Sequence, residues 1–394
     1  MRDEDRTAGS CDSCGGPIPS TAGPTCPHCG AALDREIGFR NSDARLTNEA
    51  ARLIEERSRL GLDGLVGGLE YVVINVEANH HRAAVEELLA RTGLTVDDAF
   101  ADDVRATVVL RAAGSADVLV TARRGPSPFE PFTDRPKARA LPRTRLETFG
   151  FRCVDLDAYE RIQRSRGVRF LTAEPGEGRG FRLIQTEPSA FTGNSLGLIE
   201  RIGAGRSYRT RDARDLVERF DKPERTYLDR IGRLDHAATR VRAAQRDDAI
   251  LEFIGLTNYR FDFAIYVKSL NSITNAARLS ADDFAMVFTS GIAPYVDETT
   301  SGPTERFIHD YGPRVHHLAW DTTRIDDTFA GLKRDGQEFL LDLVGSPAEG
   351  LKQTFSTPSR HTLLVNEYIH RFGDFDGFFT RSNVTLLTEA TSRQ

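Results

Sequence analysis

Apolar, strand-like runs recur along the chain at intervals of about eighty residues. Each run leads into a helix-like segment that ends at a glycine, and alternating apolar and polar runs follow each helix. The four leading runs cover residues 69–76, 151–156, 234–241 and 315–320. The pattern therefore predicts a βαβββ unit that is used four times, which makes an α+β fold.

One position of the repeat can be followed through all four leading runs. It is occupied by Tyr71, Cys153, His236 and His317. If consecutive units pair into domains, the two histidines lie on neighbouring strands and face one point in space. We expect His316 on the opposite face of the strand, because side chains alternate along a strand. In the last predicted strand Glu367 interrupts an apolar run, and a buried carboxylate requires a cation beside it.

His236, His317 and Glu367 make a two-histidine, one-carboxylate set, which is typical of Fe(II) sites that keep coordination positions open. A 2-oxo acid can fill two of these positions and dioxygen the third. The positive charge that remains on the site favours an anionic substrate. Taken singly, each residue has a simpler explanation, as a hydrogen-bonded core histidine or a solvated glutamate at a sheet edge. The shared register of the two histidines favours the metal.

Four of the five cysteines cluster in two CxxC pairs, as Cys11, Cys14, Cys26 and Cys29. Two such pairs supply four thiolates to one tetrahedral zinc ion, and closed sites of this kind are structural. We therefore predict a zinc ribbon over residues 1–34 that folds around Zn(II) and can bind a protein partner. A redox-active CxxC pair is the less favoured alternative. A helix near residues 44–60 is expected within a linker at residues 35–68.

Charge and hydropathy exclude several classes of partner. The chain of 394 residues carries 52 Lys and Arg against 58 Asp and Glu, a net charge of −6. It lacks the overall basic footprint of a nucleic-acid-binding protein, so we expect no nucleic-acid partner. No apolar stretch reaches the about 18 residues of a membrane span, and the first residues lack the apolar region of a signal peptide. We expect a cytoplasmic protein with no membrane partner; the sequence leaves a homo-oligomer open.

Residues 69 to 389 resemble the 4-hydroxyphenylpyruvate dioxygenase family of the vicinal oxygen chelate superfamily. The motifs that carry the resemblance are RLDH at 233–236, SLNS at 269–272, GPRVHHLA at 312–319, LKQTF at 351–355 and NEYIHR at 366–371. The resemblance implies two vicinal oxygen chelate domains, each a half-open β-barrel. A metal-free domain at residues 69–203 would be joined by a linker at 204–232 to a catalytic, iron-binding domain at 233–394.

The resemblance also implies roles for single residues. It assigns iron binding to His236, His317 and Glu367. It places Ser272 and Gln353 near the substrate and makes Phe355 part of an aromatic wall.

Two positions depart from the family pattern. Thr289 stands in the strand where the family usually has an asparagine that faces the substrate. Val384 replaces the last phenylalanine of the gate that usually opens the C-terminal helix. We expect Phe378 or Phe379, just before it, to cover the pocket.

The activity implied is that of an Fe(II)-dependent dioxygenase that decarboxylates 4-hydroxyphenylpyruvate or a related arylpyruvate or 2-oxo acid. The product would be of the homogentisate type, in aromatic amino acid catabolism. Three alternatives stay open: benzylic hydroxylation of the 4-hydroxymandelate synthase type, extradiol ring cleavage, and a non-catalytic binding protein on the same fold. Gln353 together with Phe355 favours the 2-oxo acid over a catechol.

Overall fold

The computed structural model describes residues 7–10, 17–19, 43–373, 375 and 377–394. The four clustered cysteines lie outside these residues, so the zinc ribbon and its ion remain predictions. The strands β1 (Thr7–Ser10) and β2 (Pro17–Pro19) are described in that part of the chain and pair antiparallel. No helix of the described residues is both long enough and apolar enough to cross a membrane.

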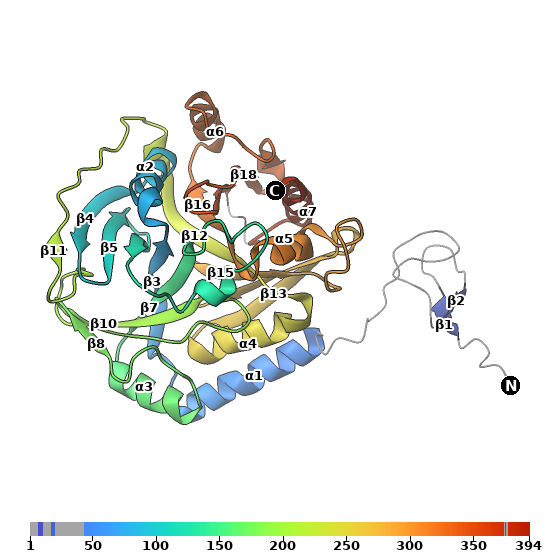
Figure 1. Cartoon of the computed structure of the whole chain (residues 1–394). Helices are drawn as coiled ribbons and strands as arrows, with labels where there is room; N and C mark the ends of the chain where they lie inside the picture. The colour runs from blue at the N-terminus through green and yellow to red at the C-terminus, as the bar shows by residue number, and fades with distance from the viewer. Residues whose placement is uncertain (1–6, 11–16, 20–42, 374, 376) are drawn as a thin grey trace.

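Two curled sheets form the body of the protein and lie next to each other (Figure 1). The first has the strand order β11-β4-β5-β6-β3-β7-β10-β9-β8. Its strands are β3 (Val66–Asn75), β4 (Thr95–Ala101), β5 (Arg105–Arg111), β6 (Asp117–Arg123), β7 (Arg145–Cys153), β8 (Gly176–Gly178), β9 (Phe181–Gln185), β10 (Ser195–Arg201) and β11 (Arg214–Asp215).

The second sheet has the order β13-β14-β15-β12-β16-β19-β18-β17. Its strands are β12 (Ile231–Arg240), β13 (Arg260–Val267), β14 (Ser272–Arg278), β15 (Ala285–Ser290), β16 (Arg314–Thr322), β17 (Val344–Ser346), β18 (Leu351–Phe355) and β19 (Val365–Arg371).

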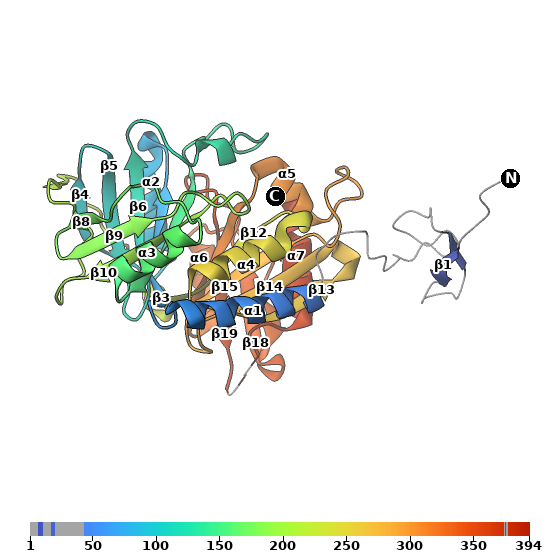
Figure 2. The same cartoon turned by 90° about the horizontal axis from the view of Figure 1, so that it is seen from below.

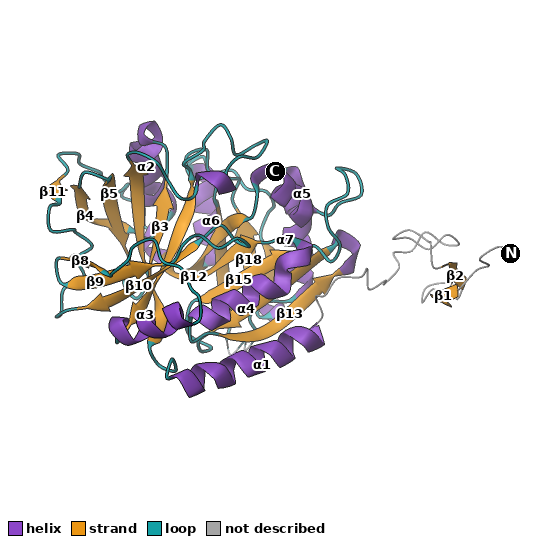
Figure 3. Cartoon of the chain, turned by 60° about the horizontal axis from the view of Figure 1, so that its bottom comes forward, coloured by secondary structure: helices purple, strands orange, loops and turns teal. Residues whose placement is uncertain are grey.

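The α-helices flank these sheets (Figure 3). In the described residues they are α1 (Asp43–Leu60), α2 (His81–Arg91), α3 (Leu156–Ser165), α4 (Arg246–Leu256), α5 (Pro303–Tyr311), α6 (Ile325–Arg334) and α7 (Arg381–Ala390).

The order of elements is a fourfold repeat. The chain runs β3-α2-β4-β5-β6, then β7-α3-β8-β9-β10, β12-α4-β13-β14-β15 and β16-α6-β17-β18-β19. In each sheet the leading strands of two units pair antiparallel at the centre, as β3 with β7 and β12 with β16. The predicted α+β fold of four βαβββ units in two half-open barrels is confirmed.

One apolar core joins the two sheets. Rings from β7 contact rings from the second half of the chain: the Phe151 centroid lies 5.8 Å from that of Phe253 and 5.5 Å from that of Tyr259. Phe149 lies 6.2 Å from Phe284. Apolar residues of α1, both sheets and α4 belong to the same buried cluster. Burial of this shared surface holds the two halves together.

The C-terminal end of α4 is a polar junction within that core, where α1 lies alongside α4 (Figure 2). The last carbonyls of a helix lack partners inside the helix. Here Arg57 of α1 and Tyr159 and Gln163 of α3 donate hydrogen bonds of 2.8–3.0 Å to them. The acceptors are the carbonyl oxygens of Ile254, Gly255, Leu256, Thr257 and Tyr259.

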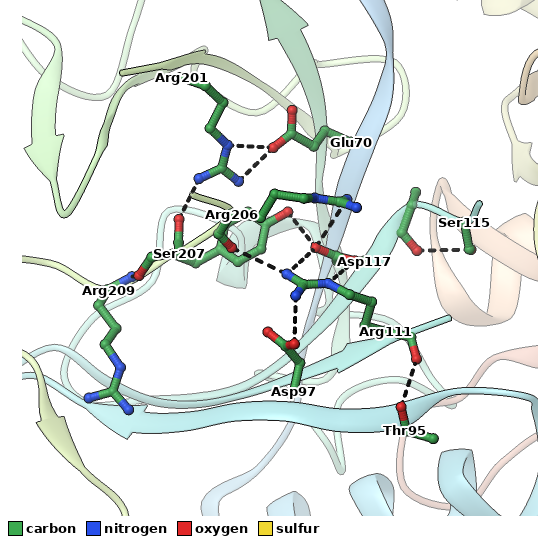
Figure 4. Close-up of polar contacts among 12 residues, drawn as sticks. Glu70, Thr95, Asp97, Arg111, Ser115, Asp117, Arg201, Arg206, Ser207 and Arg209 are labelled. Carbon is green, nitrogen blue, oxygen red and sulfur yellow. Dashed lines mark hydrogen bonds and ion pairs between the residues drawn. The ribbon is translucent and has the colours of Figure 1, made fainter. Parts of the chain in front are cut away.

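The connection between the halves fills the first half-barrel. Tyr208 donates a hydrogen bond of 2.9 Å to Asp117, which is fully buried. Arg111 and Arg206 lie 3.0 and 3.2 Å from the same carboxylate (Figure 4). The Tyr208 ring meets the Tyr71 ring edge-on at 5.2 Å. The interior of the first barrel is thus occupied by protein side chains.

We predict that Arg57→Met lowers the free energy of unfolding by about 2–4 kcal/mol, because it leaves buried carbonyls of the α4 end without donors. Urea denaturation measures this change. Arg59→Met is the control, because Arg59 is an exposed arginine of the same helix. Its effect should stay within about 0.5 kcal/mol. Equal losses for both variants would contradict the role of Arg57.

Candidate metal centre

Three donor side chains converge at one point of the second sheet. His236 comes from β12, His317 from β16 and Glu367 from β19, and the most exposed of them, His317, is 8% exposed. Glu367 Oε2 lies 3.1 Å from His236 Nε2 and 3.2 Å from His317 Nε2. One ligand atom from each residue lies within 4.8 Å of the other two. The structure thus brings together the three residues singled out in the sequence.

Strand register explains why they meet. Ala319 on β16 lies opposite His236 on one side and opposite Glu367 on the other. Residues directly opposite each other on neighbouring strands share a face, and His317, two residues before Ala319, points the same way. The small side chain of Ala319 leaves the space between the three donors free.

A partly buried ion pair orients the first histidine. Asp235 Oδ1 lies 2.7 Å from His236 Nδ1, and Arg371 contacts both oxygens of Asp235 at 2.6 and 3.1 Å. The carboxylate accepts the Nδ1 proton, so the Nε2 lone pair faces Glu367. Burial alone would raise the pKa of Asp235, but His236 and Arg371 lower it. Asp235 therefore stays ionised.

The second histidine is held by its neighbour. His317 Nδ1 lies 2.8 Å from His316 Nδ1, and His316 Nε2 lies 2.9 Å from Gln394 Oε1. These contacts suit a chain in which each ring donates one proton onward and leaves His317 Nε2 free to bind a metal.

The expectation that His316 points to the opposite face is wrong, because it lines the same cavity as His317. The pairing of β12 with β16 shifts at this point: Ala238 opposes His317 and Thr239 opposes Val315. A β-bulge leaves His316 as the extra residue and reverses the expected alternation.

The donor set fits a divalent metal ion. Glu367 Oε1 is buried without a hydrogen-bond partner among the described residues, so a ligand oxygen is unused. Burial would lower the pKa of His236, but Glu367 and Asp235 raise it to about 9. Burial and the neighbouring rings hold the pKa of His317 well below its usual range. The carboxylate thus attracts positive charge, and a metal ion bound by two neutral imidazoles supplies it.

A cavity of about 50 Å³ opens beside the three donors. Its wall includes the predicted substrate residues Ser272, Thr289, Gln353, Phe355 and Phe379. Gln353 is fully buried, and neither its amide oxygen nor its amide nitrogen has a partner among the described residues. The Thr289 hydroxyl is buried without a partner in the same way. The cavity therefore offers free polar groups.

The two phenylalanines before α7 have different places. Phe379 lines the cavity, and its ring centroid lies 5.2 Å from that of His236. Phe378 does not line the cavity, although its ring centroid lies 5.4 Å from that of His236; Arg371 and Arg278 lie over its ring at 4.7 and 5.3 Å. Val384 of α7 also lines the cavity.

A larger cavity, of about 720 Å³, lies between the two halves near α3 and α4. It contains none of the three donors. Glu252, a half-buried acid in its wall, accepts a hydrogen bond from Ser189, and desolvation raises the pKa of Glu252. We place the candidate site at the smaller cavity because His317 and Glu367 line it and His236 lies beside them.

Sequence reasoning missed several residues that line this cavity, and those with ionisable side chains among the described residues are His316 and Arg240. Arg240 lines the cavity and is 4% exposed. A signal for it existed: it lies four residues after His236 in an apolar strand, so it shares the face of the metal ligand.

The first sheet has counterparts of the three ligand positions. Tyr71 opposes Gly150 as His236 opposes Ala319, and Gly197 lies beside Gly150 as Glu367 lies beside Ala319. The counterpart of His317 is therefore Thr148. The equivalence proposed for Cys153 was wrong, because β7 begins at Arg145 and Cys153 is its last residue.

Comparison with known proteins bears on the fold. Neither a protein-family model nor a curated protein sequence matches the chain. A triple mutant of 4-hydroxymandelate synthase from Streptomyces coelicolor is similar in structure, with a TM-score of 0.62, 19% identity and coverage of 83% of this chain and 98% of that one. A xylose isomerase-like TIM barrel/4-hydroxyphenylpyruvate dioxygenase fusion protein is also similar, with a TM-score of 0.61 and 16% identity. This match covers 92% of this chain and 61% of the fusion protein. The chain has the fold of paired vicinal oxygen chelate domains.

We predict that Asp235→Asn weakens binding of a divalent metal by about tenfold to a hundredfold, because His236 loses its charged partner. Titration of Co(II) into the metal-free protein measures the affinity. Asp262→Asn is the matched control: Asp262 pairs with Arg278, the other guanidinium that lies over Phe378. Unchanged affinity in the Asp235 variant would refute the orienting role.

We predict that Gly197→Ala destabilises the protein by about 1–3 kcal/mol through overpacking. An added Cβ would lie 2.5 Å from the Tyr71 hydroxyl oxygen. Tyr71→Phe removes that oxygen and should restore most of the stability in the double variant, as thermal unfolding would show. Gly176→Ala is the control, since its nearest neighbour would be 3.8 Å away. A double variant with no recovery would contradict the clash.

Proposed function

We propose that the protein is an Fe(II)-dependent dioxygenase that decarboxylates a 2-oxo acid, with 4-hydroxyphenylpyruvate or a related arylpyruvate or 2-oxo acid as substrate. The observation that carries the proposal is the convergence of His236, His317 and Glu367 beside a cavity. Such a set leaves open coordination positions for a substrate and dioxygen. The names of the two similar structures, a 4-hydroxymandelate synthase and a 4-hydroxyphenylpyruvate dioxygenase fusion, support the same class.

Fe(II), when bound, supplies dioxygen activation and a Lewis acid for the 2-oxo carboxylate. The chain holds the ligands in fixed tautomers through Asp235 and His316. Phe355, with its ring centroid 4.7 Å from that of His317, and Phe379, beside His236, form apolar walls. These walls exclude water and orient the organic part of the substrate.

Gln353 favours a 2-oxo acid. Its free amide can donate a hydrogen bond to a carboxylate or keto oxygen, and it lies opposite Ile369 on β19, two residues from Glu367. The cavity as it stands holds only a few water molecules, since about 10–15 Å³ accommodates one. An aryl substrate therefore requires movement of Phe379 and of the α7 side chains that cover it.

Benzylic hydroxylation to a 4-hydroxymandelate-type product is the second candidate. Thr289, a short hydroxyl side chain, faces the cavity in place of the family's asparagine. The structural similarity to 4-hydroxymandelate synthase supports the same candidate. Attack on the ring with side-chain migration would give a homogentisate-type product, so product analysis separates the two.

We predict oxygen uptake with equal release of CO₂ when protein loaded anaerobically with Fe(II) receives 4-hydroxyphenylpyruvate and then oxygen. An oxygen electrode, CO₂ trapping and chromatography of the product measure the reaction. His317→Ala should lower the rate by about a hundredfold or more, because it removes a ligand. His309→Ala is the control, since His309 is exposed and stacks on Tyr295.

The reaction with catechols is followed in parallel. Uptake with catechols but not with arylpyruvates would replace the proposal by extradiol cleavage. Elemental analysis shows whether the protein holds iron. If iron-loaded protein takes up no oxygen with any of these substrates, the oxygenase proposal is contradicted and a binding role is favoured.

A further inference from the structure

Arg240 is a buried cation that faces the candidate active site. It lies on β12 in the wall of the cavity. Its guanidinium donates one hydrogen bond of 3.3 Å to the carbonyl oxygen of Pro303, and its central carbon lies 4.5 Å from the centre of the Phe307 ring. No carboxylate of the described residues pairs with it, and burial lowers its pKa to about 9. A buried arginine of this kind is costly unless an anion joins it.

Hydroxyl side chains line the same cavity as the Arg240 guanidinium. Arg240 on β12 is in register with Thr289 on β15, and Thr289 is in register with Thr274 on β14. Ser272 and Thr304 also line the cavity, with their hydroxyl oxygens 3.3 Å apart. Hydroxyls and a guanidinium together supply the donors that bind a carboxylate.

The charges of the cavity wall require a second anion. Glu367 is the one carboxylate among the described residues that line the cavity. A divalent metal ion offset by Glu367 leaves one positive charge, and Arg240 adds another. A 2-oxo acid with a single carboxylate neutralises only one of them. The strand rises by about 3.3 Å per residue, so the Cα atoms of His236 and Arg240 lie about 13 Å apart. The Arg240 side chain therefore starts at a different point of the cavity wall from the metal ligands.

We propose that Arg240 binds a second anionic group of the substrate, so that the preferred substrate is a 2-oxo acid with a carboxylate at the end away from the metal. The inference rests on the proposed function for the metal-bound end. It narrows the proposed substrates to 2-oxo acids that carry a second, distal negative charge. The carbon skeleton of such a substrate can be an arylpyruvate or aliphatic. The competing explanation is that Arg240 only fastens the start of α5 to β12 through Pro303 and Phe307.

The test compares ligands of equal shape and different charge. The full-length protein loaded with Co(II) is titrated calorimetrically, without oxygen, with 4-carboxyphenylpyruvate and with its neutral isostere 4-nitrophenylpyruvate. A second pair is 2-oxoadipate and 2-oxohexanoate. We expect the wild type to bind the distal carboxylate about tenfold to a hundredfold more tightly within at least one pair, the range of a charge-assisted hydrogen bond.

Variants then assign the preference. Arg240→Met should abolish it while leaving the affinity for 4-nitrophenylpyruvate within about threefold, and Arg240→Lys should retain part of it. Arg278→Met, which removes a guanidinium that lies over Phe378 and does not line the cavity, should leave the preference unchanged. If Arg240→Met does not fold, Thr289→Val tests the row of donors instead and should reduce the preference.

The outcomes for the two proposals are separable. Equal binding within both pairs in the wild type would overturn the inference without any variant, and so would a preference that persists in Arg240→Met. Oxygen uptake is measured separately on Fe(II)-loaded protein. A charge preference without uptake would support the anion site and count against the oxygenase; uptake without a charge preference would do the reverse.

Discussion

The architecture of the site depends on one buried carboxylate. Glu367 lies between two imidazoles in the middle of an apolar strand, where an uncompensated charge is strongly destabilising. Its compensation requires β12, β16 and β19 to be neighbours in fixed register, with the small Ala319 at the centre. The ion pair of Asp235 and Arg371 and the contact between His316 and His317 follow from the same demand. Each of them fixes a ring that must turn its free nitrogen toward the carboxylate.

The two halves of the chain have different roles in the candidate site. The second half carries the ligands and the cavity, whereas the first contributes aromatic rings to the shared core and side chains to the end of α4. Arg57, Tyr159 and Gln163 satisfy carbonyls that would otherwise be buried without donors. Since α4 packs against the sheet that holds the ligands, the first half stabilises the position of the site without touching it.

The repeat pattern of the sequence predicted the fold well, since strand and helix periods and terminal glycines are local properties. It also led to His236, His317 and Glu367 through the shared register of the histidines. Errors arose where local alternation fails. The bulge at His316 turned a side chain into the cavity. β7 begins at Arg145, before the run expected at residues 151–156, so Cys153 was matched to the ligand position in place of Thr148. The role of Arg240 depends on the absence of a counter-ion, which only the three-dimensional arrangement of the described residues shows.

In the first barrel, side-chain packing now prevents the formation of a metal site like that of the second barrel. The counterparts of the three ligands are Tyr71, Thr148 and Gly197, and the Tyr71 ring occupies the space where ligands of the second half meet. An added Cβ at Gly150 or Gly197 would lie 2.1 or 2.5 Å from Tyr71 atoms. The order of substitutions is therefore constrained. An acidic residue fits at position 197 only after the tyrosine has been replaced, and replacing the tyrosine first leaves a void beside Tyr208. Single substitutions therefore do not lead to a second metal site. The difference between a metal-binding half and a half without ligands is maintained by packing alone.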